Sequence, residues 1–166
     1  MNTADSTTPR RLLDDQLAPA WMEWLAHKTD ALDRFFTHDV PQMPPDRYSE
    51  NGIRLAEHAL LTRFTVLGTA DPDDPLLARF GCYLGEVFTQ SLDGYWINEP
   101  FPNPCLPRAT VRFPYTDLRL CVQEQVALAL HHRSGTCWSQ TYLALSGLCA
   151  AWWESGHSRR LERHTL

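Results

Sequence analysis

The sequence predicts an α+β fold: a mainly helical single domain of about five helices, with a small antiparallel β-hairpin after the third helix. At 166 residues, with 43% apolar and 21% charged residues, the chain has the length and composition of one globular domain. Apolar residues recur at spacings of three and four across residues 76–92, which is typical of a buried helix. After Asp93-Gly94, a turn signal, the aromatic and β-branched run at 95–97 favours a strand.

The composition divides the chain into three parts. Residues 1–11 are polar and small, and we expect them to be disordered. Residues 12–156 form the single α+β domain. Residues 157–166 form a basic C-terminal tail, which we expect to be frayed or to act as a contact arm.

The first half of the domain is predicted to contain two helices. Pro19 suits the first turn of a long helix. The segment 40–46, VPQMPPD, is a proline-rich loop. A second helix is expected over about 51–67, ending at Gly68, because glycine is the common residue of a C-terminal cap. On this second helix Glu57 is expected to face solvent.

The third helix is the predicted centre of the domain. Its apolar faces contain residues spaced by three and four positions: Leu76, Phe80, Tyr83, Leu84, Val87 and Phe88. Gly81 and Gly85 lie one turn apart, and since glycine weakens a helix they predict the close approach of another backbone. The remaining face is polar and includes Arg79, Glu86 and Gln90. We expect Glu86 to be solvated or paired with an arginine.

The same stretch resembles a motif of small uncharacterised bacterial proteins. The matching residues are Gly-x-Tyr-Leu-Gly-Glu-Val at 81–87, followed by Leu-x-Gly-x-Trp at 92–96. The resemblance implies a helix that leads into a strand, and it implies no activity.

The second half is predicted to contain two strands and two helices. The strands lie at 95–97 and 109–113, joined by an extended connection whose four prolines exclude it from a central sheet. Thr116 or Asp117 is expected to cap a fourth helix over 118–134. The last helix is expected to begin at Thr136 and to bury most of its aromatic residues, with Trp153 partly exposed.

Charge and hydropathy exclude two classes of partner. A net charge of −5 argues against a protein that grips nucleic acid. No run of 18 apolar residues is present, which argues against a membrane span. The first residues lack the apolar core of a secretory signal, so we expect a cytoplasmic protein.

The cysteines suggest one possible catalytic residue. Five cysteines without a C-x-x-C pair indicate reduced thiols in the cytosol. Gly135-Thr136-Cys137-Trp138 is similar to the nucleophile segment of papain-like and transglutaminase-like enzymes, and a thiol in the first turn of a helix acquires thiolate character. Those families place the catalytic histidine on a strand far downstream, whereas here His131 and His132 precede the cysteine. We therefore favour a small buried or half-buried thiol as the interpretation of Cys137.

Acidic residues and histidines raise the question of a metal site. Glu23 and His27 stand four residues apart on one helical face, and Glu154-x-x-His157 has a metal-binding spacing. The loop at 71–74 contains three aspartates but lacks the glycine and distal glutamate of an EF-hand. Solvated helix faces and helix capping explain the same residues. We therefore expect no metal and no cofactor.

The leading functional hypothesis is a non-catalytic cytosolic binding protein, such as an immunity-type inhibitor or an accessory protein. The chain is acidic and shows no complete catalytic constellation. The expected contact residues for a protein partner are Arg79, Glu86, Trp96 and Phe101. The alternative is a small enzyme or small-molecule-binding protein of a specialised biosynthetic pathway, using Cys137 or a Glu/His site. The catalytic candidates are Cys137, His131, His132 and Glu86.

Overall fold

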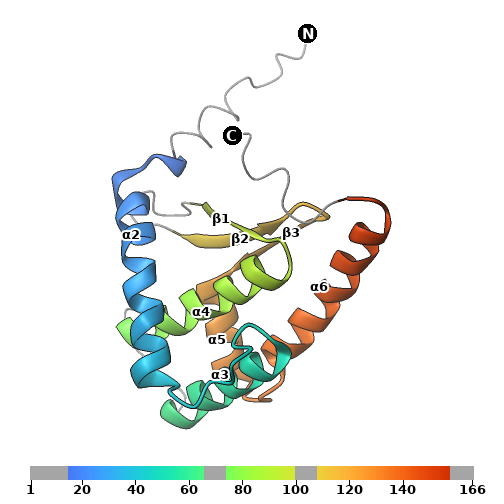
Figure 1. Cartoon of the computed structure of the whole chain (residues 1–166). Coiled ribbons are helices and arrows are strands. Elements are labelled where there is room, and N and C mark those ends of the chain that lie inside the picture. The colour runs from blue at the N-terminus through green and yellow to red at the C-terminus, as the bar shows by residue number, and fades with distance from the viewer. Residues whose placement is uncertain (1–14, 66–73, 100–107, 158–166) are drawn as a thin grey trace.

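The computed structural model describes residues 15–65, 74–99 and 108–157. The expected disordered segment 1–11, the tail beyond residue 157, and Phe101 in the proline connection lie outside the described residues. The elements, in chain order, are α2 (Pro19–Arg34), which continues as the π-helical turn η1 (Phe35–Asp39), α3 (Glu50–Arg63), α4 (Pro75–Ser91), β1 (Tyr95–Asn98), β2 (Ala109–Phe113), β3 (Thr116–Cys121), α5 (Val122–His132) and α6 (Cys137–Glu154) (Figure 1). The predicted class, α+β and mainly helical, is confirmed.

Helix α4 is the centre of the fold, as its apolar pattern predicted. Every residue from Phe80 to Thr89 is buried. The helix packs against α2, α3 and α5 and against the sheet (Figure 1). Asp74 caps its N-terminus by accepting a hydrogen bond from the Leu76 backbone N–H at 2.8 Å. A helix enclosed on so many sides must be apolar around most of its circumference.

The sheet has three antiparallel strands in the order β1-β2-β3, one more than the expected hairpin. Residues 116–121, expected to cap and begin the fourth helix, instead form β3, which pairs with β2 through Val111 and Leu120. The helix begins only at Val122. Pairing with β2 satisfies the backbone groups on the side of this segment that faces β2, and this tertiary contact outweighs the local helical pattern.

The outer edge of β1 is covered by a side chain. The Gln16 amide donates to the Asn98 carbonyl at 2.8 Å and accepts from the Asn98 N–H at 2.9 Å. It thereby takes the place of a neighbouring strand at this residue. Covered edges protect a sheet from pairing with other chains.

Helix α3 ends at Arg63, before the expected end at Leu67. The Arg133 guanidinium lies at this end and donates to the carbonyls of Leu61 at 2.9 Å and Phe64 at 2.6 Å. These donors satisfy carbonyls that have no partner within the helix. Gly68, the expected cap, lies outside the described residues.

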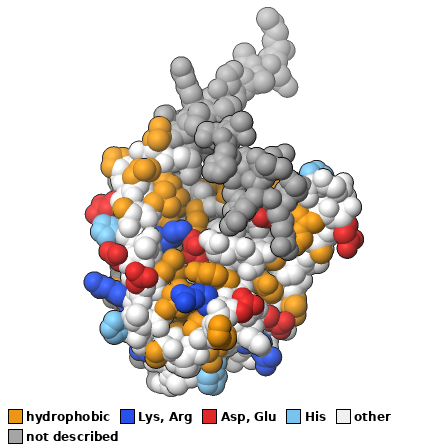
Figure 2. Space-filling model, viewed as in Figure 1, with side chains coloured by type: hydrophobic (Ala, Val, Ile, Leu, Met, Phe, Trp, Pro, Cys, Tyr) orange, Lys and Arg blue, Asp and Glu red, His pale blue; other side chains and the backbone are white. Residues whose placement is uncertain are grey.

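On one face of the molecule, charged side chains of both signs are mixed. On the face shown in Figure 2, acidic and basic side chains lie among hydrophobic ones. Within the described part of the chain, no helix is both long enough and apolar enough to cross a membrane.

Candidate functional site

Glu86 is a buried residue of α4, so its predicted place on a solvated polar face is wrong. It is only 6% exposed. Its carboxylate forms an ion pair with Lys28 and accepts hydrogen bonds from Trp96 Nε1 at 2.8 Å and Gln90 Nε2 at 3.2 Å. We call Lys28, Glu86, Gln90 and Trp96 the Glu86 cluster. The partner is a lysine, not the arginine that the sequence suggested.

Tryptophans enclose the charged part of this cluster. The Lys28 ammonium lies 5.5 Å from the centre of the Trp96 ring, within the range of a cation–π contact. The Trp24 ring meets Trp96 edge-on at 5.0 Å between ring centres, and Trp21 stacks on Trp24 at 4.9 Å. Helix α2 thus supplies both the cation and two aromatic rings, while α4 supplies the carboxylate.

Gly85 makes room for this arrangement. A Cβ atom at Gly85 would lie 1.9 Å from Cη2 of Trp96, whereas a Cβ at Gly81 would lie 3.4 Å from Cγ2 of Val122. The two glycines therefore admit side chains, not the neighbouring backbone that the sequence suggested. Of these two glycines only Gly85 is sterically required, because its missing Cβ is the space into which the indole fits.

The cluster keeps Glu86 ionised. Burial raises the pKa of Glu86, but the hydrogen bonds from Lys28 and Trp96, the positive charge of Lys28 and the Gln90 amide outweigh it, and the pKa lies below its usual value. The neighbouring thiol of Cys82 behaves differently. Burial raises the pKa of Cys82 to about 12, with Lys28 opposing and Glu86 adding to the shift. The Glu86 carboxylate is therefore ionised at neutral pH and pairs with Lys28.

Glu86 is expected to make the protein less stable in acid. Its folded pKa lies below the ordinary value of 4.5, so the unfolded chain binds the proton more readily. The stability that the carboxylate contributes is complete above that value and is lost as the pH falls through the folded pKa. Urea unfolding of the wild type and Glu86→Gln across this range measures it. The difference in unfolding free energy should shrink toward acid pH, and parallel curves for the two proteins would contradict the assignment.

Arg79 does not belong to the Glu86 cluster, although it shares the helix. Its guanidinium pairs with Asp39 of η1, at 2.5 Å from Nε and 3.1 Å from Nη2. This two-point ion pair joins α4 to the end of the α2–η1 helix. Of the residues expected to bind a partner, Glu86 and Trp96 therefore meet each other, and Arg79 lies elsewhere. Their role in partner binding stays a prediction.

Cys137 lies in the first turn of α6, as the sequence predicted, and is its first residue, but the environment does not activate its thiol. Glu57, expected to face solvent, is fully buried, and its carboxylate accepts hydrogen bonds from the backbone N–H of Cys137 at 2.9 Å and of Trp138 at 3.0 Å. Burial, with a smaller effect of the Glu57 charge, raises the pKa of Cys137. The negative carboxylate at the N-terminus of α6 opposes the helix dipole that would otherwise favour a thiolate.

The two histidines proposed as bases lie at the end of α5. Both side chains are exposed, and their rings meet each other edge-on at 5.2 Å. Within the described residues, neither forms a hydrogen bond with the Cys137 thiol. The neighbour of Cys137 is therefore the carboxylate of Glu57 and not the imidazole of a histidine.

Cys137 is therefore expected to react slowly with iodoacetamide. A raised pKa leaves less thiolate at neutral pH than a free cysteine has. Alkylation of the folded protein, followed by peptide mass spectrometry, should give a rate at Cys137 below that of a cysteine in an unfolded peptide. A Cys137 that reacts fastest of the thiols at mildly acidic pH would favour the enzyme hypothesis instead.

The candidate metal ligands have other contacts. The His27 Nδ1 atom is 2.8 Å from the Glu23 backbone carbonyl, and the His157 ring stacks on Trp152 at 4.9 Å. Asp74 caps α4, while Asp71 and Asp73 lie outside the described residues. In residues 15–65, 74–99 and 108–157, no three metal-binding side chains come together.

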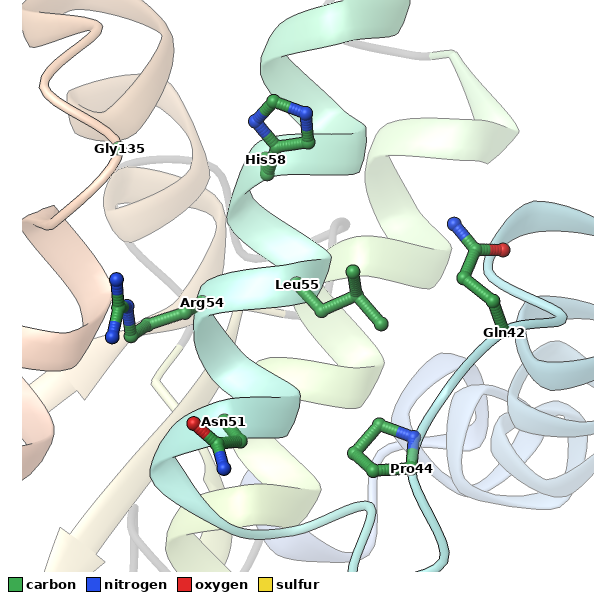
Figure 3. A pocket seen from close by; sticks show the side chains of 7 residues that line it. All are labelled: Gln42, Pro44, Asn51, Arg54, Leu55, His58 and Gly135. Carbon is green, nitrogen blue, oxygen red and sulfur yellow. The ribbon is translucent and has the colours of Figure 1, made fainter.

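A shallow depression lies on the outer side of α3. Its volume is about 520 Å³, and it is lined by α3, the loop after η1 and the turn between α5 and α6: Gln42, Pro44, Asn51, Arg54, Leu55, His58 and Gly135. Leu55 points toward Gln42 and Pro44, while Arg54 extends on the other side of the helix toward the Gly135 turn (Figure 3). We call this depression the α3 pocket.

Sequence reasoning missed Lys28, Glu57 and the α3 pocket. Lys28 carried one signal, because it is the only lysine in a chain rich in arginine. Glu57 lies on the expected polar face of its helix and gave none. The pocket joins three segments that are distant in sequence, so no local pattern marks it.

The motif at residues 81–96 forms the helix-to-strand unit of α4 and β1. Its resemblance to small uncharacterised bacterial proteins remains a prediction. Comparison of the chain with protein-family models, with curated proteins and with solved structures finds no match.

Proposed function

We propose that this protein acts by binding a partner protein, without catalysis, and that the exposed side of α6 is the contact surface. One observation supports the proposal. The exposed side of α6 presents an apolar surface, the α6 face, formed by Leu143, Ala144, Gly147, Leu148 and Ala151. No charged residue occurs in the sequence from Cys137 to Trp153.

The buried side of α6 explains why the exposed side is unusual. Trp138, Leu145 and Cys149 are buried, and the helix packs against α3 and α5. A helix with one side in the core normally has a polar opposite side. Here Leu143 is 52% exposed and Leu148 is 46% exposed on that opposite side. Exposed apolar surface of this kind is typical of a protein contact site.

The geometry of α6 suits helix packing against a partner. The helix lies at the outer edge of the molecule, where its far side is free of the other labelled elements (Figure 1). Small residues at 144, 147 and 151 let another backbone approach closely, and the two leucines provide apolar side chains beside them. Burial of such surface contributes about 25 cal/mol per Å².

We propose a role without catalysis because the thiol of Cys137 is not activated. Burial and Glu57 raise the pKa of Cys137, which removes the activation that a nucleophilic cysteine needs. An immunity-type inhibitor or an accessory protein of the cytoplasm is the role we propose for such a binding protein. The sequence suggested a different contact surface, around Glu86 and Trp96. We propose the α6 face in its place, because the polar groups of Glu86 and Trp96 are hydrogen-bonded to each other.

The test places a photo-crosslinking amino acid at position 148 in the native host. A matched variant carries it at Leu118 on β3, which is 53% exposed. Position 148 should crosslink one protein species that position 118 does not, and mass spectrometry identifies it. Its affinity is then measured with purified components. Leu148→Glu should weaken binding by about 30-fold or more, since it places a charge in an apolar contact, while Leu118→Glu should not.

Two results would contradict the proposal. One is equal affinity of the purified partner for the wild type and Leu148→Glu. The other is crosslinking at position 118 as strong as at position 148. A crosslinked species of twice the mass of the chain would identify a second copy as the partner.

A further inference from the structure

We propose that the α3 pocket binds a small organic anion whose carboxylate or phosphate group pairs with Arg54, independently of the α6 face. Arg54 is an exposed residue of α3 and lines the pocket. Among the described residues its guanidinium has no ion pair and no hydrogen bond. Glu50, one turn earlier on the same helix, is not paired with it.

An unpaired arginine is the exception in this structure. The other arginines of the described residues, apart from Arg34, bind within the chain. Arg63 and Arg133 donate to backbone carbonyls, Arg47 lies over the Phe36 ring, and Arg79, Arg108, Arg112 and Arg119 pair with carboxylates. Of the two arginines without a partner among the described residues, Arg54 lines the α3 pocket. A guanidinium offers a two-point donor surface that matches carboxylate and phosphate groups.

The other lining residues favour an anion over a cation. The pocket contains one imidazole, that of His58, and the amides of Asn51 and Gln42, but no carboxylate. This is notable in a chain with a net charge of −5. His58 lies one turn after Arg54 on the same helix, so both side chains are available to one ligand.

The pocket also has an apolar part. Leu55 and Pro44 are half-buried and lie together on one side of α3, opposite the side on which Arg54 extends (Figure 3). An anionic group bound at Arg54 would leave the apolar side at Leu55 open to the body of a longer ligand. The volume of about 520 Å³ is in the range of small-molecule sites.

The experiment titrates the ¹⁵N-labelled protein with three probes of one shape: benzoate, phenyl phosphate and benzyl alcohol. Saturable shifts of the backbone amides should appear at residues 51–58, Gln42 and Gly135 with at least one anion. The anion that binds more tightly shows whether the site prefers a carboxylate or a phosphate. Benzyl alcohol, which lacks the charge, should bind at least about tenfold more weakly.

The matched variants are Arg54→Gln and Arg34→Gln, which remove in turn the two arginines that have no partner among the described residues. Arg54→Gln should weaken anion binding by about tenfold or more, and Arg34→Gln should leave it unchanged. Both residues are exposed, and circular dichroism checks that both variants fold. Equal binding by the two variants, equal binding of benzyl alcohol, or no saturable shift with either anion would overturn the proposal.

Discussion

Glu57→Ala is expected to lower the free energy of unfolding by about 3 kcal/mol. The substitution removes a buried carboxylate that accepts two backbone N–H groups at the start of α6. Loss of a helix cap costs about 1 kcal/mol, and leaving buried donors without acceptors adds about 1–3 kcal/mol. Helix α6 has no other side-chain cap, so no other residue takes over this role. Urea unfolding followed by circular dichroism measures the change.

Two further variants separate the contributions. Glu57→Gln keeps one acceptor oxygen but loses the charge at the helix N-terminus, and we expect roughly half of the loss. Glu23→Ala removes an exposed glutamate of α2 whose carboxylate has no bonding partner among the described residues, and should change the free energy by less than about 0.5 kcal/mol. A Glu57→Ala protein as stable as Glu23→Ala would show that the carboxylate does not cap α6.

Gly85→Ala is expected to destabilise the protein by about 3 kcal/mol, although alanine is the better helix former. The new Cβ would lie 1.9 Å from Cη2 of Trp96, so the indole must leave its place beside α4. Its movement breaks the hydrogen bond to Glu86 and the edge contact with Trp24. Overpacking of a core costs about 1–3 kcal/mol, and the lost aromatic contact adds about 0.5–1.5 kcal/mol. Tryptophan fluorescence should shift to the red.

Gly81→Ala and Gly147→Ala are the controls, because each also replaces a helical glycine by alanine but at a position with room for the Cβ atom. A Cβ at Gly81 would meet Val122 at 3.4 Å, and a Cβ at Gly147 would meet nothing within 4 Å. Both glycines lie inside helices, so replacement by alanine should stabilise the protein by up to about 1 kcal/mol. If Gly85→Ala stabilised the protein as these two do, the close fit of Trp96 on α4 would be wrong.

The sequence alone predicted the parts of the fold that depend on neighbouring residues. The period of the apolar residues identified α4 and its central position, and Asp93-Gly94 marked the turn into β1. The α+β class was also predicted correctly, and the start of α6 was predicted to within one residue. These features follow from the spacing of side chains within a few turns of helix or a few residues of strand, which a single sequence displays directly.

Only the tertiary structure decided where the charged residues lie and which segments pair. Glu86 meets Lys28 across 58 positions, and Glu57 meets the backbone of Cys137 across 80. On a helical pattern both glutamates occupy polar positions and were assigned to the surface. They are buried because distant donors compensate the loss of hydration. Residues 116–121 form β3 and not a helix for a related reason, since β2 supplies the backbone partners. The α3 pocket likewise exists only where three distant segments meet.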